Sequence, residues 1–245
     1  MKSQPPPETK QPDSAPASAG VLYVVATPIG NLSDVTRRAE SILKECDVIA
    51  CEDSRITRRL LNRLGIEATT LSYHEHNEKE RAPYLALLIE EGKQIALVSD
   101  AGTPTLSDPG FRLVRECRRR GLRVIPIPGP SAVITALSAS GLPTNAFFFA
   151  GFLPPKTAAR QRFFTTYREF PYTICLYESP HRIEKCVRDI VSALGPDRTI
   201  TVCKELTKIH EKFVTGRSED VQRTLQVMSL KGEFVVLIAP GGYEL

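Results

Sequence analysis

The sequence lacks the features that define membrane, zinc-binding and disulfide-linked proteins. No apolar run in its 245 residues reaches the roughly 18 residues that a helix needs to cross a bilayer. Its six cysteines form no C-x-x-C pair, and its four histidines show no zinc-ligand spacing with them. We therefore expect buried free thiols, a cytoplasmic location, and neither a metal nor a membrane partner.

The sequence also lacks both glycine-rich phosphate-binding signatures. G-x-x-x-x-G-K-[ST] and G-x-G-x-x-G are absent, which excludes a P-loop nucleotide hydrolase at that level. The stretch SDAGTPTLSDPG (99–110) has two aspartates but no lysine or arginine, so it is a poor triphosphate cradle. It suits a ligand whose groups near the loop are neutral or cationic, such as S-adenosylmethionine. The alternative is that the stretch forms purely structural turns. Within it, Ser107, Asp108 and Pro109 are expected to cap and start the next helix.

The composition indicates a globular chain preceded by a polar N-terminal segment. The formal charge of +4 permits an anionic partner such as RNA without requiring one. Residues 1–20 are rich in proline, serine and alanine and lack the apolar centre of a signal peptide, which predicts a disordered tail. The turn-forming segment PIPGPSA (126–132) predicts a domain boundary near Gly129. We expect an N-terminal domain over 21–128 and a C-terminal domain over 129–245.

Apolar runs and helical patterns alternate in the first of these domains. This alternation is typical of parallel βαβ units, and it predicts a doubly wound α/β fold. The expected strands are 21–26, 47–52, 94–100 and 123–128, and the expected helices are 33–45, 54–65 and 84–92. Ser33 and Ser54 are the expected N-caps, and Gly65 is an expected helix stop.

The second domain is expected to be α/β with a mixed sheet. A helix is expected over 131–141, ending at Gly141. The expected strands are 145–152, 172–178, 199–205 and 233–240, with a short antiparallel strand over 212–217. In open α/β sheets ligands bind beyond the carboxyl ends of strands, where this chain has unusual loops. Those loops are ATPIGN (26–31), CEDSR (51–55), SDAGTPTLSDPG (99–110) and PIPGPSA (126–132).

These loops resemble those of the tetrapyrrole-methylase superfamily of S-adenosylmethionine-dependent methyltransferases. More narrowly, the chain from Leu22 to about Ala239 resembles the bacterial small-subunit ribosomal RNA cytidine-2′-O-methyltransferase I family. The motifs that carry the resemblance, in order, are ATPIGNLSDVTRRA, CEDSR, HEHNE, VSDAGTPTLSDPG, PIPGPSA, SGLPTNAFFFAGFLPPK, YESPHR, KELTKIHE and LKGEFV. Ser54 stands where the family often has threonine, and Lys204 where it often has arginine.

The resemblance implies S-adenosylmethionine bound in a folded form in a cleft between two α/β domains. The residues that it implies for cofactor binding are Pro28, Ile29, Gly30, Asp100, Ala101, Gly102, Thr103, Pro104, Ser131, Ala132, Leu176, Tyr177 and Pro240. Ordinary loop packing is the alternative interpretation for each of them.

The implied reaction is 2′-O-methylation of a cytidine ribose in the decoding region of 16S ribosomal RNA. The methyl donor is already activated, so the protein mainly aligns the ribose hydroxyl with the methyl group. A carboxylate could remove the hydroxyl proton. Glu178, at the end of a predicted strand, is the first candidate and Glu205 the second; a purely structural carboxylate is the alternative for both.

Charged and polar residues near the same loops are candidates for substrate contacts. They are Arg55, Arg58, Arg59, His74, Glu75, Asn77, His181 and Arg182. Arginines leaving the cleft on a helix can neutralise phosphates, although a solvated helix face is the alternative. The implied partners are ribosomal RNA or the 30S subunit and a second copy of the chain in a homodimer.

Two other functions compete with RNA methylation. A C-methyltransferase acting on an acidic tetrapyrrole would use the same cleft, and a non-enzymatic RNA-binding module would use the same arginines. The segments HEHNE, YESPHR and ELTK resemble the RNA branch of the superfamily. Plain RNA binding needs no cofactor loops, which argues against the binding module.

Overall fold

The computed structural model describes residues 20–245, which form two compact units. Unit 1 contains the described residues up to Ala26 together with Thr36–Pro128, and unit 2 contains Thr27–Val35 together with Gly129–Leu245. The chain therefore leaves unit 1 after its first strand, contributes residues 27–35 to unit 2, and returns. We call this stretch the crossover segment. The disordered tail predicted over residues 1–20 lies outside the described residues except for Gly20.

Unit 1 is a parallel sheet with helices on both faces, which confirms the predicted doubly wound fold. The strand order is β3-β2-β4-β1-β5, and every pair is parallel. The strands are β1 Val21–Val25, β2 Val48–Cys51, β3 Thr70–Ser72, β4 Gln94–Val98 and β5 Arg123–Ile127. The helices are α1 Arg37–Glu45, α2 Ser54–Leu64, α3 Glu78–Glu90 and α4 Phe111–Arg119.

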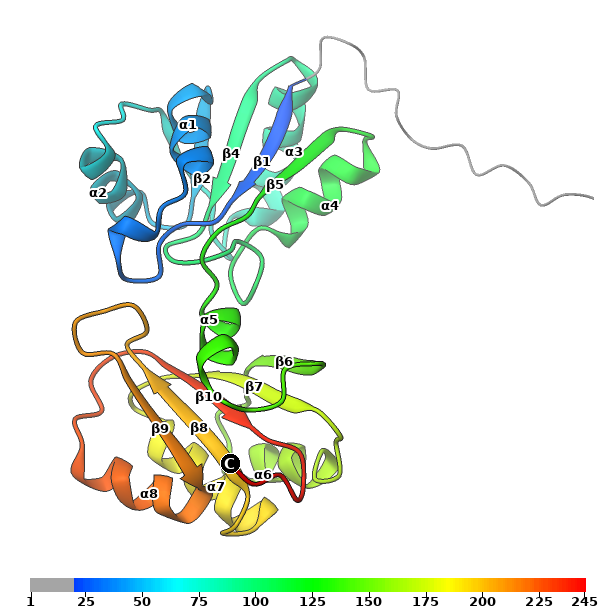
Figure 1. The fold of residues 1–245 in the computed structure, drawn as a ribbon. Helices are drawn as coiled ribbons and strands as arrows, with labels where there is room; N and C mark the ends of the chain where they lie inside the picture. The colour runs from blue at the N-terminus through cyan, green and yellow to red at the C-terminus, as the bar shows by residue number, and fades with distance from the viewer. Residues whose placement is uncertain (1–19) are drawn as a thin grey trace, which may run out of the picture. The chain divides into compact units, whose positions relative to one another are not determined.

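The core of unit 1 explains this layering. Apolar residues of α3 and α4, such as Leu85 and Leu113, pack against Leu22 and Leu97 of the sheet. Figure 1 shows α1 and α2 on the opposite side of the sheet from α3 and α4. Strand β3 is absent from the sequence expectation, because three residues are too short to show an alternating pattern.

The helix starts in unit 1 differ from those expected. Thr36 caps α1 by accepting a hydrogen bond from the N–H of Ala39, whereas Ser33 lies in a 3-10 turn, Leu32–Asp34. Asp53 caps α2 in place of Ser54, while Gly65 ends that helix as expected. The Asp53 carboxylate reaches forward and accepts from the N–H of Arg55, the second residue of the helix, at 2.8 Å.

The expected start of α4 is wrong. The helix begins at Phe111 after Gly110, with no side-chain cap, so Ser107, Asp108 and Pro109 do not cap it. Asp108 instead accepts a hydrogen bond from Ser99 at the end of β4. The loop folds back onto the sheet before the helix starts, and this contact lies too far along the chain to be read from local capping patterns.

Unit 2 is built on the expected mixed sheet. Its order is β6-β7-β10-β8-β9, in which β6 and β7 are parallel, and β10 is antiparallel to both β7 and β8. The expected antiparallel strand over 212–217 is confirmed as the partner of β8. The strands are β6 Phe147–Phe152, β7 Thr173–Glu178, β8 Thr199–Lys204, β9 Lys212–Arg217 and β10 Phe234–Ile238.

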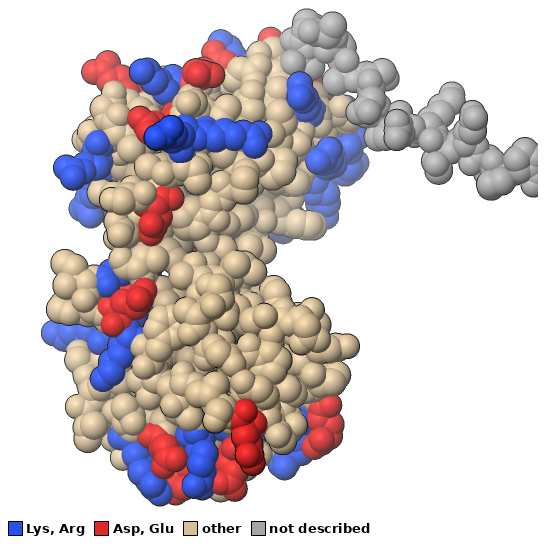
Figure 2. All heavy atoms as spheres, viewed as in Figure 1, with Lys and Arg blue, Asp and Glu red and all other residues tan. Residues whose placement is uncertain are grey.

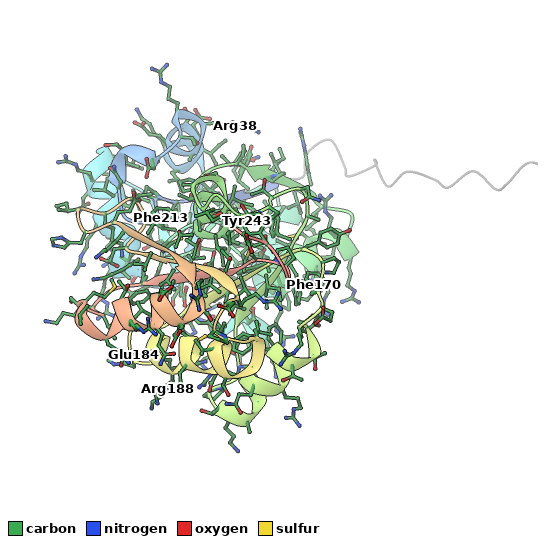
Figure 3. The ribbon with its side chains drawn as sticks, turned by 60° about the horizontal axis from the view of Figure 1, so that its bottom comes forward. Arg38, Phe170, Glu184, Arg188, Phe213 and Tyr243 are labelled. Carbon is green, nitrogen blue, oxygen red and sulfur yellow. The ribbon has the colours of Figure 1, made fainter. Side chains whose placement is uncertain are left out.

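Helices cover the two faces of this sheet unequally. The helices are α5 Ala132–Ala139, α6 Thr157–Thr166, α7 Ile183–Leu194 and α8 Ser218–Val227. Helices α6, α7 and α8 share one core with the sheet, and α5 and Ile29 of the crossover segment pack on the other face. In Figure 3, Glu184 and Arg188 project from the side of α7 that points away from the sheet.

A buried ion pair links α6 to α7. The side chains of Arg160 and Asp189 are 1% and 5% exposed, and Arg160 Nη2 lies 2.6 Å from Asp189 Oδ2. Arg160 Nη1 also donates to the carbonyl of Pro155 at 2.6 Å. The pair thereby fixes the loop after β6 to the helical layer. Around α8 the ion pairs are exposed instead, and Figure 2 shows acidic and basic groups interspersed at that end of the unit.

The six cysteines are free and buried, as the spacing predicts. Burial raises the pKa of the Cys175 and Cys203 thiols to about 12, so both are protonated at neutral pH. Over residues 20–245 no helix is both long and apolar enough to cross a bilayer. No group of histidine, cysteine or acidic side chains that could hold a metal is present in that part of the chain.

Candidate functional site

Four carboxylates gather at the carboxyl edge of the unit 1 sheet. Glu52 and Asp53 follow β2, Asp100 follows the neighbouring strand β4, and Asp108 returns to Ser99. The backbone N–H of Asp53 donates to Asp100 Oδ1 at 3.0 Å. Parallel strands bring these side chains to one edge, which is where open α/β sheets bind ligands. We call these four residues the carboxylate cluster.

The carboxylate cluster holds more negative charge than its surroundings neutralise. Burial, together with the negative charges of neighbouring carboxylates, raises the pKa of Glu52. Burial is also the main cause that raises the pKa of Asp100, and it raises that of Asp108 to about 6. Only Asp53 is compensated: hydrogen bonds from Arg55 lower its pKa to about 2. A cation binding here would relieve this repulsion.

Sequence reasoning missed three members of the carboxylate cluster. Glu52 and Asp53 lie inside the motif CEDSR but are not among the predicted site residues, and Asp108 is expected only to cap a helix. Their significance depends on burial and on the spacing between β2 and β4. The signal available in the sequence was that acidic residues directly follow the apolar runs of β2 and β4, and these two strands are neighbours in the parallel sheet.

The loop after Asp100 has a fixed and unusual backbone. Gly102 is buried with φ +84°, and Thr105 and Ser107 have φ +76° and +64°. Pro104 is buried, Thr103 is half-buried and Ala101 is exposed. Positive φ at residues other than glycine costs free energy and persists only where the surroundings fix it. The loop is therefore held in one shape beside the carboxylate cluster.

The predicted arginine set lies on the exposed side of α2. Arg55 is engaged by Asp53, with Nη2 to Oδ2 at 2.6 Å. Arg58 and Arg59 are exposed and form no ion pair with any of residues 20–245. These two cations are thus available to an anionic ligand.

The HEHNE segment forms a turn between β3 and α3. Asn77 Oδ1 accepts from the N–H of His74 at 2.9 Å, and Asn77 Nδ2 donates to the carbonyl of Ser72 at 3.1 Å. Glu75 is exposed at the tip of the turn. Asn77 therefore shapes the turn, while His74 Nδ1 is buried without a hydrogen-bond partner among the described residues.

In unit 2 several predicted cofactor residues gather on one face of the sheet. Ile29, Ala132 and Tyr177 belong to the same apolar cluster, which covers the face bearing α5. Pro28 is buried beside Ile29. Ser131 immediately precedes α5, and its buried Oγ has no hydrogen-bond partner within residues 20–245. An unused hydroxyl at a helix N-terminus is a site where a ligand oxygen can bind.

Two other predicted cofactor residues lie elsewhere in unit 2. The side chain of Leu176 packs in the core on the opposite face, under α7. Pro240 follows β10, which runs antiparallel to β7 and pairs Phe234 with Glu178 and Ile238 with Ile174. Pro240 therefore lies beyond the opposite end of these paired strands from Glu178.

Both candidate bases are held in ion pairs. Glu178 is 3% exposed, accepts from the N–H of Ser179 at 2.8 Å, and lies 3.2 Å from Arg182 Nε. Glu205 accepts from Lys208 Nζ at 2.8 Å and from the N–H of Glu233 at 2.9 Å. Partial burial acts to raise the pKa of Glu205, but these hydrogen bonds and the charge of Lys208 lower it overall.

Residues His181 and Arg182 stand at the start of α7, Ile183–Leu194. His181 is exposed. Arg182 donates from Nη2 to the carbonyl of Leu153 at 2.6 Å, so it fastens the loop after β6 in addition to pairing with Glu178. The motifs YESPHR and FLPPK, separated in sequence, are therefore in contact.

Comparison with known proteins identifies the class. Residues 21–222 match the family model described as Tetrapyrrole (Corrin/Porphyrin) Methylases. Solved structures agree on the fold: diphthine synthase has a TM-score of 0.71 at 14% identity over 92% of each chain. Uroporphyrin-III-C-methyltransferase from Thermus thermophilus has a TM-score of 0.62 at 20% identity, over 90% of this chain and 94% of that one.

Curated relatives narrow the assignment. A protein of Escherichia coli O157:H7 named ribosomal RNA small subunit methyltransferase I is 50% identical over 94% of this chain and 81% of its own length. Its namesake in Mesorhizobium japonicum is 47% identical over 89% of this chain and 75% of its own length. The chain therefore belongs to the tetrapyrrole methylases and, within them, to the ribosomal RNA small subunit methyltransferase I family. The predicted family is confirmed.

Proposed function

We propose that the chain transfers a methyl group from S-adenosylmethionine to the ribose 2′-hydroxyl of a cytidine in the decoding region of 16S ribosomal RNA. The observation that carries the proposal is the 50% identity to a protein named for small-subunit ribosomal RNA methylation, over nearly the whole chain. The methyl donor would supply an activated methyl group on a sulfonium. The chain's task is then to bind, orient and align.

The carboxylate cluster of unit 1 fits the positive groups of this donor. Glu52, Asp100 and Asp108 have raised pKa values because burial and mutual repulsion outweigh the hydrogen bonds and the charge of Arg55 that act in the other direction. A sulfonium or ammonium group would stabilise their ionised forms. In this proposal Asp100 to Pro104 contact the donor, supported by the fixed backbone of that loop.

The α5 face of unit 2 fits other parts of the donor. Ser131 Oγ is buried without a partner among the described residues, and the first N–H groups of α5 lie beside it. Together they suit a carboxylate such as that of the methionine moiety. Pro28, Ile29, Gly30, Ala132 and Tyr177 would contribute packing on this face, with Leu176 and Pro240 contributing through backbone groups.

The substrate contacts fall on exposed cations. Arg58 and Arg59 on α2, free of ion pairs with any described residue, would bind RNA phosphates. Arg55, His74, Glu75, Asn77 and His181 would border the same substrate. Arg182 would act by positioning the loop after β6, because it donates to the carbonyl of Leu153.

Proton removal is the minor part of the proposed mechanism. Glu205, the more exposed of the two candidates, is hydrogen-bonded to Lys208, and its pKa is lowered, which makes it a weak base. Glu178 is buried against Arg182. Alignment of the hydroxyl with the methyl group therefore supplies most of the rate enhancement in this proposal. A homodimer working in the cytoplasm completes it, supported by the family resemblance.

The test is a labelling experiment with three acceptors. The protein is incubated with methyl-labelled donor and unmethylated 30S particles, naked 16S ribosomal RNA or uroporphyrinogen, and each product is digested and mapped. We expect label on one cytidine ribose in the RNA or the particle. Label in the tetrapyrrole alone would contradict RNA methylation and favour the C-methyltransferase alternative.

A further inference from the structure

The loop that joins β8 to β9, residues 205–211, presents an apolar side chain to solvent. Ile209 is 98% exposed, more than any other large hydrophobic side chain of residues 20–245. The loop extends beyond the ends of its strands in Figure 1. A single exposed apolar side chain is ordinary on a protein surface. The loop that carries Ile209 is unusual, because its backbone is strained and its lysine is anchored to neighbouring residues.

The backbone of the loop is strained at two positions. Glu205 has φ +51° and Thr207 has φ +65°, and a positive φ is strongly disfavoured for a β-branched residue. The N–H of Thr207 donates to Glu211 Oε2 at 2.6 Å, and that of Lys208 to the carbonyl of Glu205 at 3.0 Å. Strain of this kind clusters where a loop must hold one shape for its function.

Lys208 anchors the loop to two neighbouring segments. Its Nζ bonds Glu205 Oε1 at 2.8 Å and Glu233 Oε2 at 2.9 Å. Its Cγ would lie 2.5 Å from a Cβ at Gly30, and Glu205 Cδ would lie 2.5 Å from a Cβ at Gly232, so both contacts favour glycine. Ile209 therefore follows directly after a residue fixed against the crossover segment, where donor contacts are proposed.

Uncompensated cations accompany the exposed isoleucine. Lys212 opens β9 and Lys231 precedes Gly232, so both lie at the same edge of the sheet as the loop. Both are exposed, and neither forms an ion pair with a described residue. An apolar tip flanked by free cations matches stacked bases flanked by phosphates, whereas a purely apolar partner would leave the lysines unpaired.

We propose that Ile209 inserts between stacked bases next to the target cytidine and unstacks them, with Lys212 and Lys231 binding the adjacent phosphates. Apolar side chains at rigid tips act in this way in other nucleic-acid-binding proteins. Unstacking would release the ribose for alignment with the methyl donor. The inference rests on the proposed function, because it assumes an RNA substrate.

Fluorescence of 2-aminopurine tests the inference independently of methyl transfer. The base is placed beside the target cytidine in 16S ribosomal RNA, which is used both naked and reconstituted into 30S particles. The full chain is compared with Ile209→Ser, with the conservative Ile209→Leu, and with Val227→Ser as the control. Val227 is also exposed, at 87%, but ends α8 outside every proposed site.

We expect the parent, Ile209→Leu and Val227→Ser to raise the fluorescence severalfold on binding. Ile209→Ser should not raise it, and its RNA affinity should fall by about tenfold, while its melting temperature and donor affinity stay unchanged. Equal fluorescence for the parent and Ile209→Ser, or no rise with the parent, would overturn the inference. Methyl transfer by the parent, measured on the same samples, tests the proposed function separately.

Discussion

The acidic residues that follow β2 and β4 in unit 1 differ in their environment from those at the carboxyl ends of β7 and β8 in unit 2. In unit 1, Glu52, Asp100 and Asp108 lie close together and form no ion pair with any of residues 20–245, and burial with mutual repulsion raises their pKa values despite the nearby charge of Arg55. In unit 2, Glu178 and Glu205 are each held by a cation, Arg182 or Lys208. Uncompensated carboxylates at a ligand-binding edge indicate a cationic ligand, whereas compensated ones indicate a fixed scaffold.

The largest effect should come from breaking the most buried ion pair of unit 2. Asp189→Ala leaves the Arg160 guanidinium buried without its carboxylate, which should lower the free energy of unfolding by about 3–5 kcal/mol. Asp220→Ala, which removes an exposed partner of Arg223, should cost less than about 1 kcal/mol. Urea denaturation of both variants measures this, and equal losses would contradict a structural role for buried pairing.

A smaller effect of opposite sign is expected in unit 1. The pKa of Asp108 is raised to about 6, so the folded state holds this proton more tightly than the unfolded state. The carboxylate therefore reduces stability as pH rises from about 4 through 6. Asp108→Asn should be stabilising relative to the parent by about 1 kcal/mol at pH 8, after allowance for solvent screening, and by less at pH 5.

Thermal unfolding of the parent and Asp108→Asn across this pH range measures the difference. If Asp108→Asn changes the stability by the same amount at pH 5 and pH 8, the Asp108 carboxylate is already compensated in the folded state. That result would contradict the proposed contrast between the acidic residues of unit 1 and those of unit 2.

The smallest effect concerns the free arginines on α2. Replacing Arg58 or Arg59 with alanine should weaken RNA binding evenly across sequences and reduce the slope of log affinity against log salt by about 1 for each. Arg55→Ala should change the slope less, because Asp53 already neutralises Arg55. Filter binding at several salt concentrations measures the slopes. Equal slopes for the three variants would contradict the distinction between the free Arg58 and Arg59 and the ion-paired Arg55.

Most of the fold followed from patterns that are local in sequence. Within residues 20–245, nine of the ten strands coincide with segments predicted from the sequence, because each is long enough to show a pattern. Strand β3, Thr70–Ser72, is the exception and is held mainly by pairing with β2. The course of residues 27–35 into unit 2 could not be predicted, since it depends on the packing of Ile29 with α5.

The candidate site was predictable only as a set of loops. The order of the motifs located Asp100 and Ser131, but the roles of Glu52 and Asp108 arise from burial and from spacing across strands. The same limit applies to Glu178 and Arg182, whose pairing with each other and with the loop after β6 appears only in three dimensions.

Calorimetric titration of S-adenosylmethionine tests the contrast between the two edges most directly. Asp100→Asn keeps the acceptor for the N–H of Asp53 but removes the charge, so donor affinity should fall by about tenfold with the fold intact. Glu178→Gln should lower the melting temperature and leave donor affinity nearly unchanged. Unchanged affinity for Asp100→Asn, or an equal loss for Glu178→Gln, would contradict the assignment of the carboxylate cluster as the binding site for the donor's positive groups.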